Sequence, residues 1–345
     1  STHTPESAIL SGLVGSEMCI RDRTSSSVGE IEENQILIKV IYLSLDPYMR
    51  GRMSDVKSYA EPLKIGEIIT AESAGIVIQS KSEKFQPGDY VCCRSGWQEY
   101  FISNDKDPMT YKVNPDLVPL STYLGVCGMT GRTAYFGLMR EAMPVAGETL
   151  VVSAASGAVG SIVGQIGKQI GLNVIGIAGG KKKCDYVVDE LGFDECVDYK
   201  SDSFHKELES AVPNGIDIYF ESVGGMVTEA VSKFFNEGSR APICGYISNY
   251  NAKDLSKVKT PFHIFGAMKN PPKHKFFLVF NHYASFDEAN EYLINGVKSG
   301  TLKYREMIED GLEKAPEYFE WLFTGRNFGC LLYTSPSPRD QRGSR

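Results

Sequence analysis

The stretch "SAASGAVGSIVGQIGKQIG", from Ser153 to Gly171, constrains the fold most, because closely spaced glycines connect a buried apolar run to an amphipathic one. The preceding "TLVVSA" is typical of a buried strand, and residues 158–170 have the period of a helix. The unit then repeats: the predicted strands "NVIGIA", "ECVDY", "IDIYFES" and "SRAPICG" alternate with predicted helices at 182–191, 203–211 and 225–236. Short strands separated by helices predict an α/β domain with a doubly wound parallel sheet, the Rossmann architecture.

The part of the chain before this alternation has a different rhythm. From Ile31 to about Tyr123, short runs such as "QILIKVIYLSL", "ESAGIVIQS" and "DYVCCRS" predict a β-rich domain punctuated by turns. After a predicted helix at "SFDEANEYLINGVKSG", the segment "YREMIEDGLEKAPEYFEWLFTG" indicates a return to that domain. We therefore expect a β-rich substrate domain from 28–124 plus 299–329, and a dinucleotide-binding domain from 125–298.

The two ends differ from the rest of the chain. "SEMCIRDR" near the start and "LLYTSPSPRD" near the end look like translated sequencing-adapter read-through. We expect residues 1–27 and 330–345 to be non-native or disordered, and to lie outside the fold.

Composition and charge exclude several functional classes. Of the 345 residues, 42% are hydrophobic and 23% charged, which is the balance of a soluble globular protein. The net charge of -7 gives no general attraction to nucleic acid or to an anionic membrane, and no apolar stretch reaches the roughly 18 residues of a membrane span. Eight scattered cysteines without a CxxC pair are typical of a reducing compartment, and we expect a cytoplasmic location.

The glycine turn matches a dinucleotide fingerprint in which Ala155 replaces the first glycine. Gly157 would let the backbone approach a pyrophosphate, and Gly160 would let the helix pack closely on the strand. The helix start offers N–H groups and a dipole that favour anions. The alternative is a turn that serves helix packing alone. Its place between a strand and a helix, at the start of a βαβ series, favours the dinucleotide.

The end of the second strand distinguishes between two cofactors. An NAD site needs an acidic residue about 20 residues after the turn, to bind the ribose 2′-hydroxyl. Here "IAGGKKK" has no carboxylate, and Lys183 could pair with a 2′-phosphate. Three lysines in a first helical turn oppose the helix dipole unless an anion is bound. The alternative is a solvated helix start, but the pattern favours NADP(H).

The sequence gives no indication of a catalytic metal. Residues 31–123 contain no histidine, their only cysteines are Cys92 and Cys93, and the five histidines of the chain lack ligand spacing. The remaining chemistry is hydride transfer from the cofactor, with a tyrosine hydroxyl as a hydrogen-bond donor. The candidate donors are Tyr48, Tyr135, Tyr246 and Tyr250, for each of which a packing role is the alternative.

Eight motifs together resemble one family. "SLDPYMRGRM", "FQPGDYV", "GWQEYF", "LGVCGMTGRTAYFGL", "AASGAVGSIVGQIGK", "LGFDECVDYK", "YFESVGG" and "ICGYISNYN" occur in this order. The chain from 28 to 329 closely resembles the zinc-independent medium-chain dehydrogenase/reductases, specifically the NADP-dependent alkenal and 2-alkenone reductases and the prostaglandin reductase/leukotriene B4 12-hydroxydehydrogenase proteins. The resemblance implies a GroES-like β-rich domain beside the Rossmann domain, a homodimer, and a small enal or enone as substrate.

The resemblance also implies roles for individual positions. Tyr48 and Tyr250 would be the catalytic candidates, Tyr48 at the substrate pocket. Lys183 and Tyr199 would contact the 2′-phosphate region. The expected cofactor-binding residues are Gly157, Ala158, Val159, Gly160, Lys183, Tyr199, Ser222, Cys244, Gly245, Tyr246, Ile247, Ser248, Asn249, Tyr250, Phe277, Leu278, Val279 and Asn327, with no metal ligand.

Some positions depart from the family pattern. Ser222 stands where the family usually has asparagine, and a shorter side chain would weaken one cofactor hydrogen bond. No tyrosine matches the family's pocket tyrosine just before the strand at Phe277. The family's opening hairpin and closing strand are replaced by the foreign-looking ends, so exposed sheet edges would make this chain less stable than its relatives.

We therefore expect NADPH-dependent reduction of the C=C bond of α,β-unsaturated aldehydes or ketones, of the alkenal/2-alkenone or 15-oxo-prostaglandin type, with hydride delivered to the β-carbon. The alternatives are an NADPH quinone reductase of the same fold and a non-catalytic NADPH-binding protein.

Overall fold

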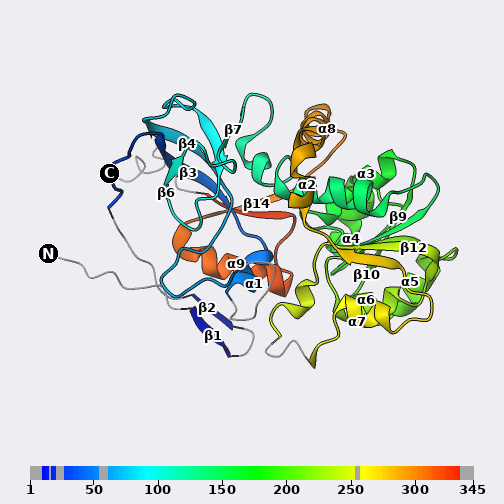
Figure 1. Ribbon diagram of the computed structural model, residues 1–345. Coiled ribbons are helices and arrows are strands. Elements are labelled where there is room, and N and C mark those ends of the chain that lie inside the picture. Colours follow the sequence, from blue (N-terminus) through cyan, green and yellow to red (C-terminus); the bar gives the residue numbers. More distant parts are fainter. Residues whose placement is uncertain (1–9, 15–16, 21–26, 54–60, 253–256, 335–345) are drawn as a thin grey trace, which may run out of the picture. The chain divides into compact units, whose positions relative to one another are not determined.

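A computed structural model describes the chain except for residues 1–9, 15–16, 21–26, 54–60, 253–256 and 335–345 (Figure 1). The chain divides into two compact units. The first contains residues up to Leu124 together with Glu306–Asn327 and the residues from Leu331 onward. The second contains Gly125–Arg305 and the short segment Phe328–Cys330.

The second unit is built on a parallel sheet of six strands. Its spatial order is β10-β9-β8-β11-β12-β13, in which the first three strands by sequence run one way from the centre and the last three run the other. This is the doubly wound order, so the predicted Rossmann fold is confirmed. The strands are β8 (Thr149–Ser153), β9 (Asn173–Ala178), β10 (Glu195–Asp198), β11 (Ile216–Phe220), β12 (Phe235–Ile243) and β13 (Lys273–Phe276).

Helices cover both faces of this sheet, with α3 on one side and α5, α6 and α7 on the other (Figure 1). On the second side, Leu208 of α5, Val231 of α6 and Phe265 of α7 are fully buried against strand residues such as Tyr219. The helices are α2 (Met129–Phe136), α3 (Gly160–Gln169), α4 (Lys181–Asp185), α5 (Phe204–Ala211), α6 (Gly225–Val231), α7 (Pro261–Gly266) and α8 (Phe286–Ser299).

One boundary in this unit differs from the sequence prediction. The helix expected over 225–236 ends at Val231, and β12 begins at Phe235. The Phe234 carbonyl accepts the Ile216 N–H at 2.8 Å, and Phe235 pairs with Ile216 across the sheet. Two consecutive phenylalanines pack against the core here, and pairing with β11 takes precedence over the helical pattern.

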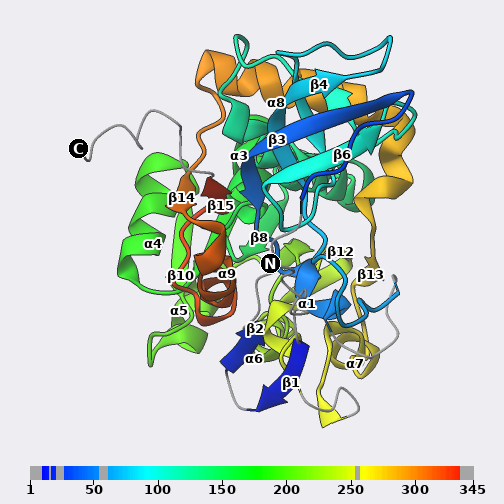
Figure 2. The same ribbon diagram turned by 90° about the vertical axis from the view of Figure 1, so that its left-hand side faces the viewer.

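The first unit contains a seven-stranded, largely antiparallel sheet with the order β14-β15-β3-β4-β5-β7, and β6 pairs with β3 (Figure 2). Beside it lie α1 (Tyr48–Arg52) and α9 (Ala315–Thr324). The strands are β3 (Gln35–Ser44), β4 (Ser73–Ser80), β5 (Tyr90–Cys93), β6 (Tyr100–Asn104), β7 (Tyr111–Lys112), β14 (Glu306–Asp310) and β15 (Cys330–Thr334).

The expectation that both ends lie outside the fold is wrong for part of each end. Strand β15 pairs antiparallel with β3, with Leu332 opposite Ser44, and both Leu332 and Tyr333 are fully buried. The apolar run Leu331–Tyr333 thus covers an edge of β3 and joins the core beside Phe319. Near the start, β1 (Leu10–Val14) and β2 (Glu17–Ile20) pair as a two-stranded antiparallel sheet. Apart from β1, β2, β15 and Ser27, the residues of 1–27 and 330–345 lie outside the described part of the chain.

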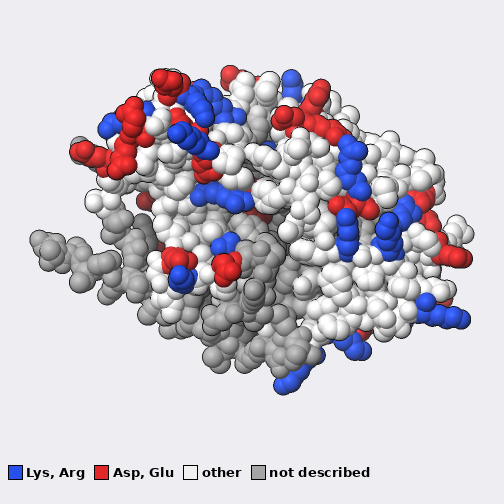
Figure 3. Space-filling view, in the orientation of Figure 1, with Lys and Arg blue, Asp and Glu red and all other residues white. Residues whose placement is uncertain are grey.

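Charged side chains of both signs intermingle over the face shown in Figure 3. This distribution suits the net charge of -7, which gives no general attraction to nucleic acid. Among the residues that the structure describes, no helix is both long and apolar enough to cross a membrane.

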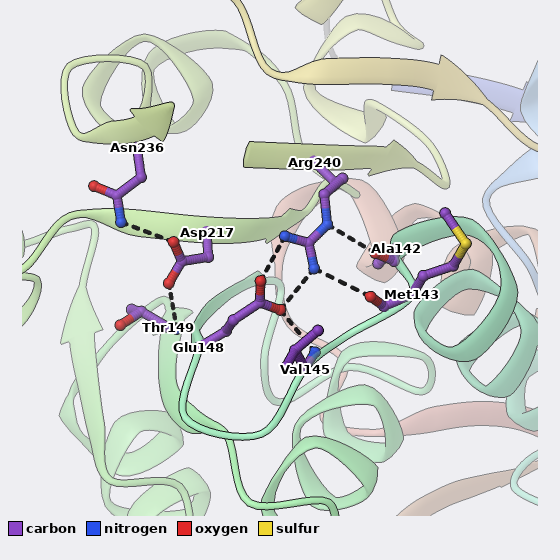
Figure 4. A network of polar contacts seen from close by, with 8 residues as sticks. All are labelled: Ala142, Met143, Val145, Glu148, Thr149, Asp217, Asn236 and Arg240. Atoms are coloured by element: carbon purple, nitrogen blue, oxygen red, sulfur yellow. Dashed lines mark hydrogen bonds and ion pairs between the residues drawn. The ribbon is translucent and has the colours of Figure 1, made fainter. Parts of the chain in front are cut away.

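A polar network joins the interior strands β8, β11 and β12 of the Rossmann sheet to the loop before β8 (Figure 4). The Arg240 guanidinium on β12 binds both carboxylate oxygens of Glu148 at 2.6 and 2.7 Å, and its Nε donates to the Ala142 carbonyl at 2.9 Å. On β11, Asp217 accepts the Thr149 N–H at 2.8 Å. These contacts hold the loop that leads into β8, from which the glycine turn continues.

Candidate cofactor and active site

The glycine turn follows β8, whose five residues are all buried. Ala154 has a positive φ of 51°, and the Gly157 N–H donates to the Ala154 carbonyl at 2.8 Å. A Cβ on Gly160 would lie 2.4 Å from the same carbonyl oxygen. Only glycine therefore lets α3 begin this close to the end of β8, which is the packing role that its place in the motif predicts.

The start of α3 fits a pyrophosphate. Gly157, Ala158 and Val159 are partly exposed, and within the described chain the N–H groups of Ala158, Val159 and Gly160 donate no backbone hydrogen bond. The ten-residue helix adds its dipole at this end. Donors without acceptors at an accessible helix start are what a bound diphosphate requires.

A segment distant in sequence braces this turn. The Gly329 N–H donates to the Ser156 carbonyl at 3.2 Å, and Gly157 and Gly329 form a parallel bridge. The Cys330 N–H in turn donates to the Arg305 carbonyl at 2.9 Å. Sequence reasoning missed this contact, because nothing in the local pattern around Gly329 indicates which turn it meets.

The end of β9 forms a basic site. Lys181 and Lys182 are exposed, whereas Lys183 is partly buried, with its Nζ 5.9 Å from the centre of the Phe328 ring. Burial lowers the pKa of Lys183, and the positive charge of Lys200 lowers it further. Two cations that disfavour each other's charge would both be stabilised by a phosphate dianion between them. The residues thus fit the 2′-phosphate of NADP(H).

The surroundings of Lys183 also explain the lack of a ribose-binding carboxylate. Asp198 is the nearby acid, but its Oδ1 accepts the N–H groups of Gly180 at 2.7 Å and Lys200 at 2.9 Å. A Cβ on Gly179 would lie 2.8 Å from the Tyr199 ring. Tyr199 therefore packs directly against the end of β9, and Lys200, which lowers the pKa of Lys183, has its Nζ 6.0 Å from the centre of the Tyr199 ring.

The opposite side of the candidate site is formed by the ends of β11 and β12. The Cys244 N–H donates to the Glu221 carbonyl at 2.8 Å, and the Ser248 N–H donates to the Val223 carbonyl at 2.9 Å. The predicted segments 222–225 and 244–250 are thus joined by backbone hydrogen bonds. Cys244, Tyr246, Ile247 and Tyr250 are partly exposed, Ser248 is exposed, and Gly245 and Asn249 are buried.

Glu221 organises this side, and sequence reasoning missed it. Its carboxylate is fully buried, and Oε1 accepts the N–H groups of Val223 at 2.7 Å and Gly224 at 3.0 Å and the Tyr219 hydroxyl at 3.1 Å. The Thr228 hydroxyl bonds Oε2. An acidic residue directly after an apolar strand was the available signal, because such a side chain is buried only when it is hydrogen-bonded.

Ser222, the departure from the family pattern, places its hydroxyl in a buried position. Among the described residues this oxygen makes no hydrogen bond of ordinary geometry, and the polar group that it faces is the Cys244 thiol. Burial raises the pKa of that thiol to about 12, while the Ser222 hydroxyl exerts a smaller opposing effect. Cys244 is therefore a neutral thiol at neutral pH.

The remaining residues that the sequence predicts to contact the cofactor or the substrate are divided between the two units. The Tyr246 N–H donates to the Tyr250 hydroxyl at 3.4 Å, so the Tyr250 side chain folds back along its own segment. The Phe277 N–H donates to the Ile243 carbonyl, and its buried ring packs edge-on against Phe220, while Leu278 is partly exposed and Val279 is buried. Tyr48 and Asn327 belong to the first unit, Tyr48 at the start of α1 against its hydrophobic cluster.

The described residues contain no group of three or more His, Cys, Asp or Glu side chains that could hold a metal ion. Tyr135, a further hydroxyl candidate, donates to Glu288 at 2.7 Å and packs on Phe136. The partners of Tyr135 thus lie on α2 and α8. These contacts fit a packing role for Tyr135, which was the alternative to a catalytic role.

Comparisons with known proteins agree with this geometry. Residues 18–111 match the family described as the N-terminal domain of oxidoreductase, and residues 158–275 match the family described as zinc-binding dehydrogenase. The chain is 44% identical over 303 residues to an NADPH-dependent curcumin reductase of Escherichia coli, covering 87% of each chain. It is 41% identical over 298 residues to a 2-alkenal reductase (NADP(+)-dependent) of Nicotiana tabacum, covering 86% of each.

A solved structure is also similar. CurA from Vibrio vulnificus in complex with NADPH matches with a TM-score of 0.86 and 43% identity, over 91% of this chain and 94% of that one. A match that covers 91% of this chain extends over both units. The chain belongs to the zinc-independent, NADP-dependent alkenal reductase family of the medium-chain dehydrogenase/reductases.

Proposed function

We propose that this protein reduces the carbon–carbon double bond of α,β-unsaturated aldehydes and ketones with NADPH. The observation that carries the proposal is the basic site at Lys183, in a chain more than 40% identical to reductases named for NADPH and for a 2-alkenal. NADP(H) is the cofactor. The particular aldehyde or ketone, including the prostaglandin type, is part of the proposal.

Each group of residues has a distinct task in this proposal. Gly157 to Gly160 bind the pyrophosphate through backbone N–H groups. Lys183 and Tyr199 bind the 2′-phosphate, with Lys200 nearby. The segments Ser222–Gly225, Cys244–Tyr250 and Phe277–Val279 hold the nicotinamide end, and Asn327 supplies a contact near the chain's last strand.

Bound NADPH supplies a hydride, which the β-carbon of the substrate accepts. The electrons of the double bond shift to give an enolate with negative charge on the carbonyl oxygen, and the α-carbon then takes a proton from water to complete the reduction. Tyr48 and Tyr250 are the hydrogen-bond donors to that oxygen that the family resemblance suggests, because a neutral hydroxyl can stabilise developing negative charge. Homodimerisation remains a prediction of the family resemblance.

The test is NADPH consumption with a series of enals and enones of increasing chain length, in the absence of added metal. We expect turnover with NADPH, much slower turnover with NADH, and no effect of a chelator. Quinones serve as the comparison substrates. A requirement for zinc, a preference for NADH, or NADPH binding without turnover of any enone would contradict the proposal.

A further inference from the structure

A buried carboxylate lies behind the proposed nicotinamide side of the site. Glu221 has no solvent exposure, and no ion pair between described residues includes it. Its partners are two backbone N–H groups and three hydroxyls, those of Ser153, Tyr219 and Thr228, all neutral. Such a group either carries an uncompensated negative charge or takes up a proton, and the donors around it decide between the two.

The geometry favours the charged form. The two N–H groups on Oε1 can only donate, and Tyr219 and Thr228 supply a hydroxyl donor to each oxygen. Burial raises the pKa of Glu221, and these same four donors act against that rise. A carboxylate that accepts several hydrogen bonds is stabilised as an anion even where water is excluded.

The same residue is connected to both segments that would hold the nicotinamide. The carboxylate bonds the N–H groups of Val223 and Gly224, and the Glu221 carbonyl accepts the N–H groups of Cys244 at 2.8 Å and Gly245 at 3.3 Å. Whatever these segments bind therefore contacts backbone that is hydrogen-bonded to Glu221, a residue that is shielded from solvent.

We propose that Glu221 is an anionic positioning residue that makes the site prefer the oxidised, positively charged nicotinamide ring of NADP⁺ over the neutral ring of NADPH. The inference rests on the proposed function, since it needs the two segments to hold the nicotinamide. A fixed negative charge in a poorly solvated region attracts a cationic ring and leaves a neutral ring unaffected. The charge thereby also favours hydride release, because the nicotinamide gains positive charge as the reaction proceeds.

The experiment compares dissociation constants for NADP⁺ and NADPH by direct titration, without substrate. Glu221→Gln removes the charge and keeps an oxygen that accepts the two backbone N–H groups. We expect the NADP⁺ dissociation constant to rise on the order of tenfold, as for a unit charge in a region of intermediate dielectric. The NADPH dissociation constant should change by less than about threefold, because its ring is neutral.

Asp217→Asn is the matched control. Asp217 lies on the same strand four residues earlier, roughly 13 Å away along the strand, and it accepts the Thr149 N–H and the Asn236 amide at 2.8 Å each. Losing this charge should leave the ratio of the two dissociation constants unchanged. Glu221→Asp keeps the charge while disturbing the hydrogen bonds, so both constants should shift together.

Thermal unfolding shows whether the variants are folded. If Glu221→Gln does not fold, the double variant Tyr219→Phe, Thr228→Val removes two of the three hydroxyl donors and leaves only Ser153, and a loss of NADP⁺ preference in the same direction is expected. Equal weakening of NADP⁺ and NADPH, or no change in either, would overturn the inference. A wild-type protein that binds neither nucleotide would instead refute the proposed function.

Discussion

Lys181, Lys182 and Lys183 share one helical turn, but only Lys183 is partly buried. Lys181 is exposed and pairs with Asp185 at 2.7 Å, four residues later on the same helix. Lys183 instead lies near the Phe328 ring and within the electrostatic influence of Lys200. Position within the turn, and not the residue type, therefore determines which lysine can recognise a phosphate.

This difference gives the first prediction at the scale of residues. Lys183→Ala should weaken NADPH binding by about tenfold or more, the loss expected for a hydrogen bond to a charged group. NADH binding should hardly change, because NADH lacks the 2′-phosphate. The measurement is a pair of fluorescence titrations, one with each nucleotide.

Lys181→Ala is the control, because it removes the same charge from the exposed side of the same turn. Its NADPH affinity should stay within about twofold of the wild type, as for a solvent-screened charge. An equal loss of NADPH affinity in both variants would show that general attraction, and not a specific contact, selects NADPH.

At the scale of elements, the Arg240–Glu148 pair joins β12 to the loop before β8. The exposed fraction of the side chain is 17% for Arg240 and 21% for Glu148, so solvent screens this ion pair less than it screens a pair on the surface. The Arg240 hydrogen bonds are the main cause of the lowered pKa of Glu148. The pair therefore stabilises the folded state when Glu148 is ionised.

A pH-dependent stability follows from this arrangement. Because the pKa of Glu148 is lower in the folded state, the stabilisation is present above the ordinary glutamate value and is lost as the pH falls through the folded-state value. Arg240→Gln should cost about 1–3 kcal/mol of unfolding free energy at pH 7. The unfolding free energies of the wild type and the variant should converge as the pH falls below the lowered folded-state pKa of Glu148, as followed by urea unfolding at each pH.

The control at this scale is the exposed Lys181–Asp185 pair. Lys181→Ala should leave the unfolding free energy at pH 7 nearly unchanged, because solvent screens this exposed pair. A constant difference between wild type and Arg240→Gln across all pH values would mean that Glu148 contributes no ionisation-dependent stability.

Particular elements show how much of this arrangement is predictable from sequence. The buried strands at "TLVVSA" and "NVIGIA" and the turn between them are predictable, because apolar runs and glycines act locally. Lys183 is predictable for the same reason. Glu221 and Gly329 are not, because their roles depend on partners brought together by the sheet. Strand β15 was missed because "LLYT" is too short to indicate a strand by itself, and it forms one only by pairing with β3.

At the scale of the whole molecule, the residues after Asn327 contribute to both units. Leu332 is fully buried in the sheet of the first unit, next to β3. Leu332→Ala should therefore destabilise the protein by about 2–5 kcal/mol, the usual cost of emptying a buried leucine site. Urea unfolding monitored by tryptophan fluorescence measures this, since both tryptophans lie in the same unit.

Ile308 on the neighbouring strand β14 supplies the control, because its side chain is 41% exposed. Ile308→Ala should cost less than about 1 kcal/mol, as its apolar surface is already in water. If Leu332→Ala and Ile308→Ala both lowered the unfolding free energy by a similar small amount, β15 would not stabilise the sheet in solution.

The bridge between Gly157 and Gly329 has a consequence for how the protein is made. A ribosome synthesises the Rossmann unit up to Arg305, then 22 residues of the other unit, Glu306–Asn327, and only then the segment Phe328–Cys330. During that interval the pyrophosphate turn lacks the hydrogen bond from Gly329. If the turn binds the pyrophosphate as proposed, a nascent chain would reach its full affinity for the nucleotide only after synthesis has passed Gly329.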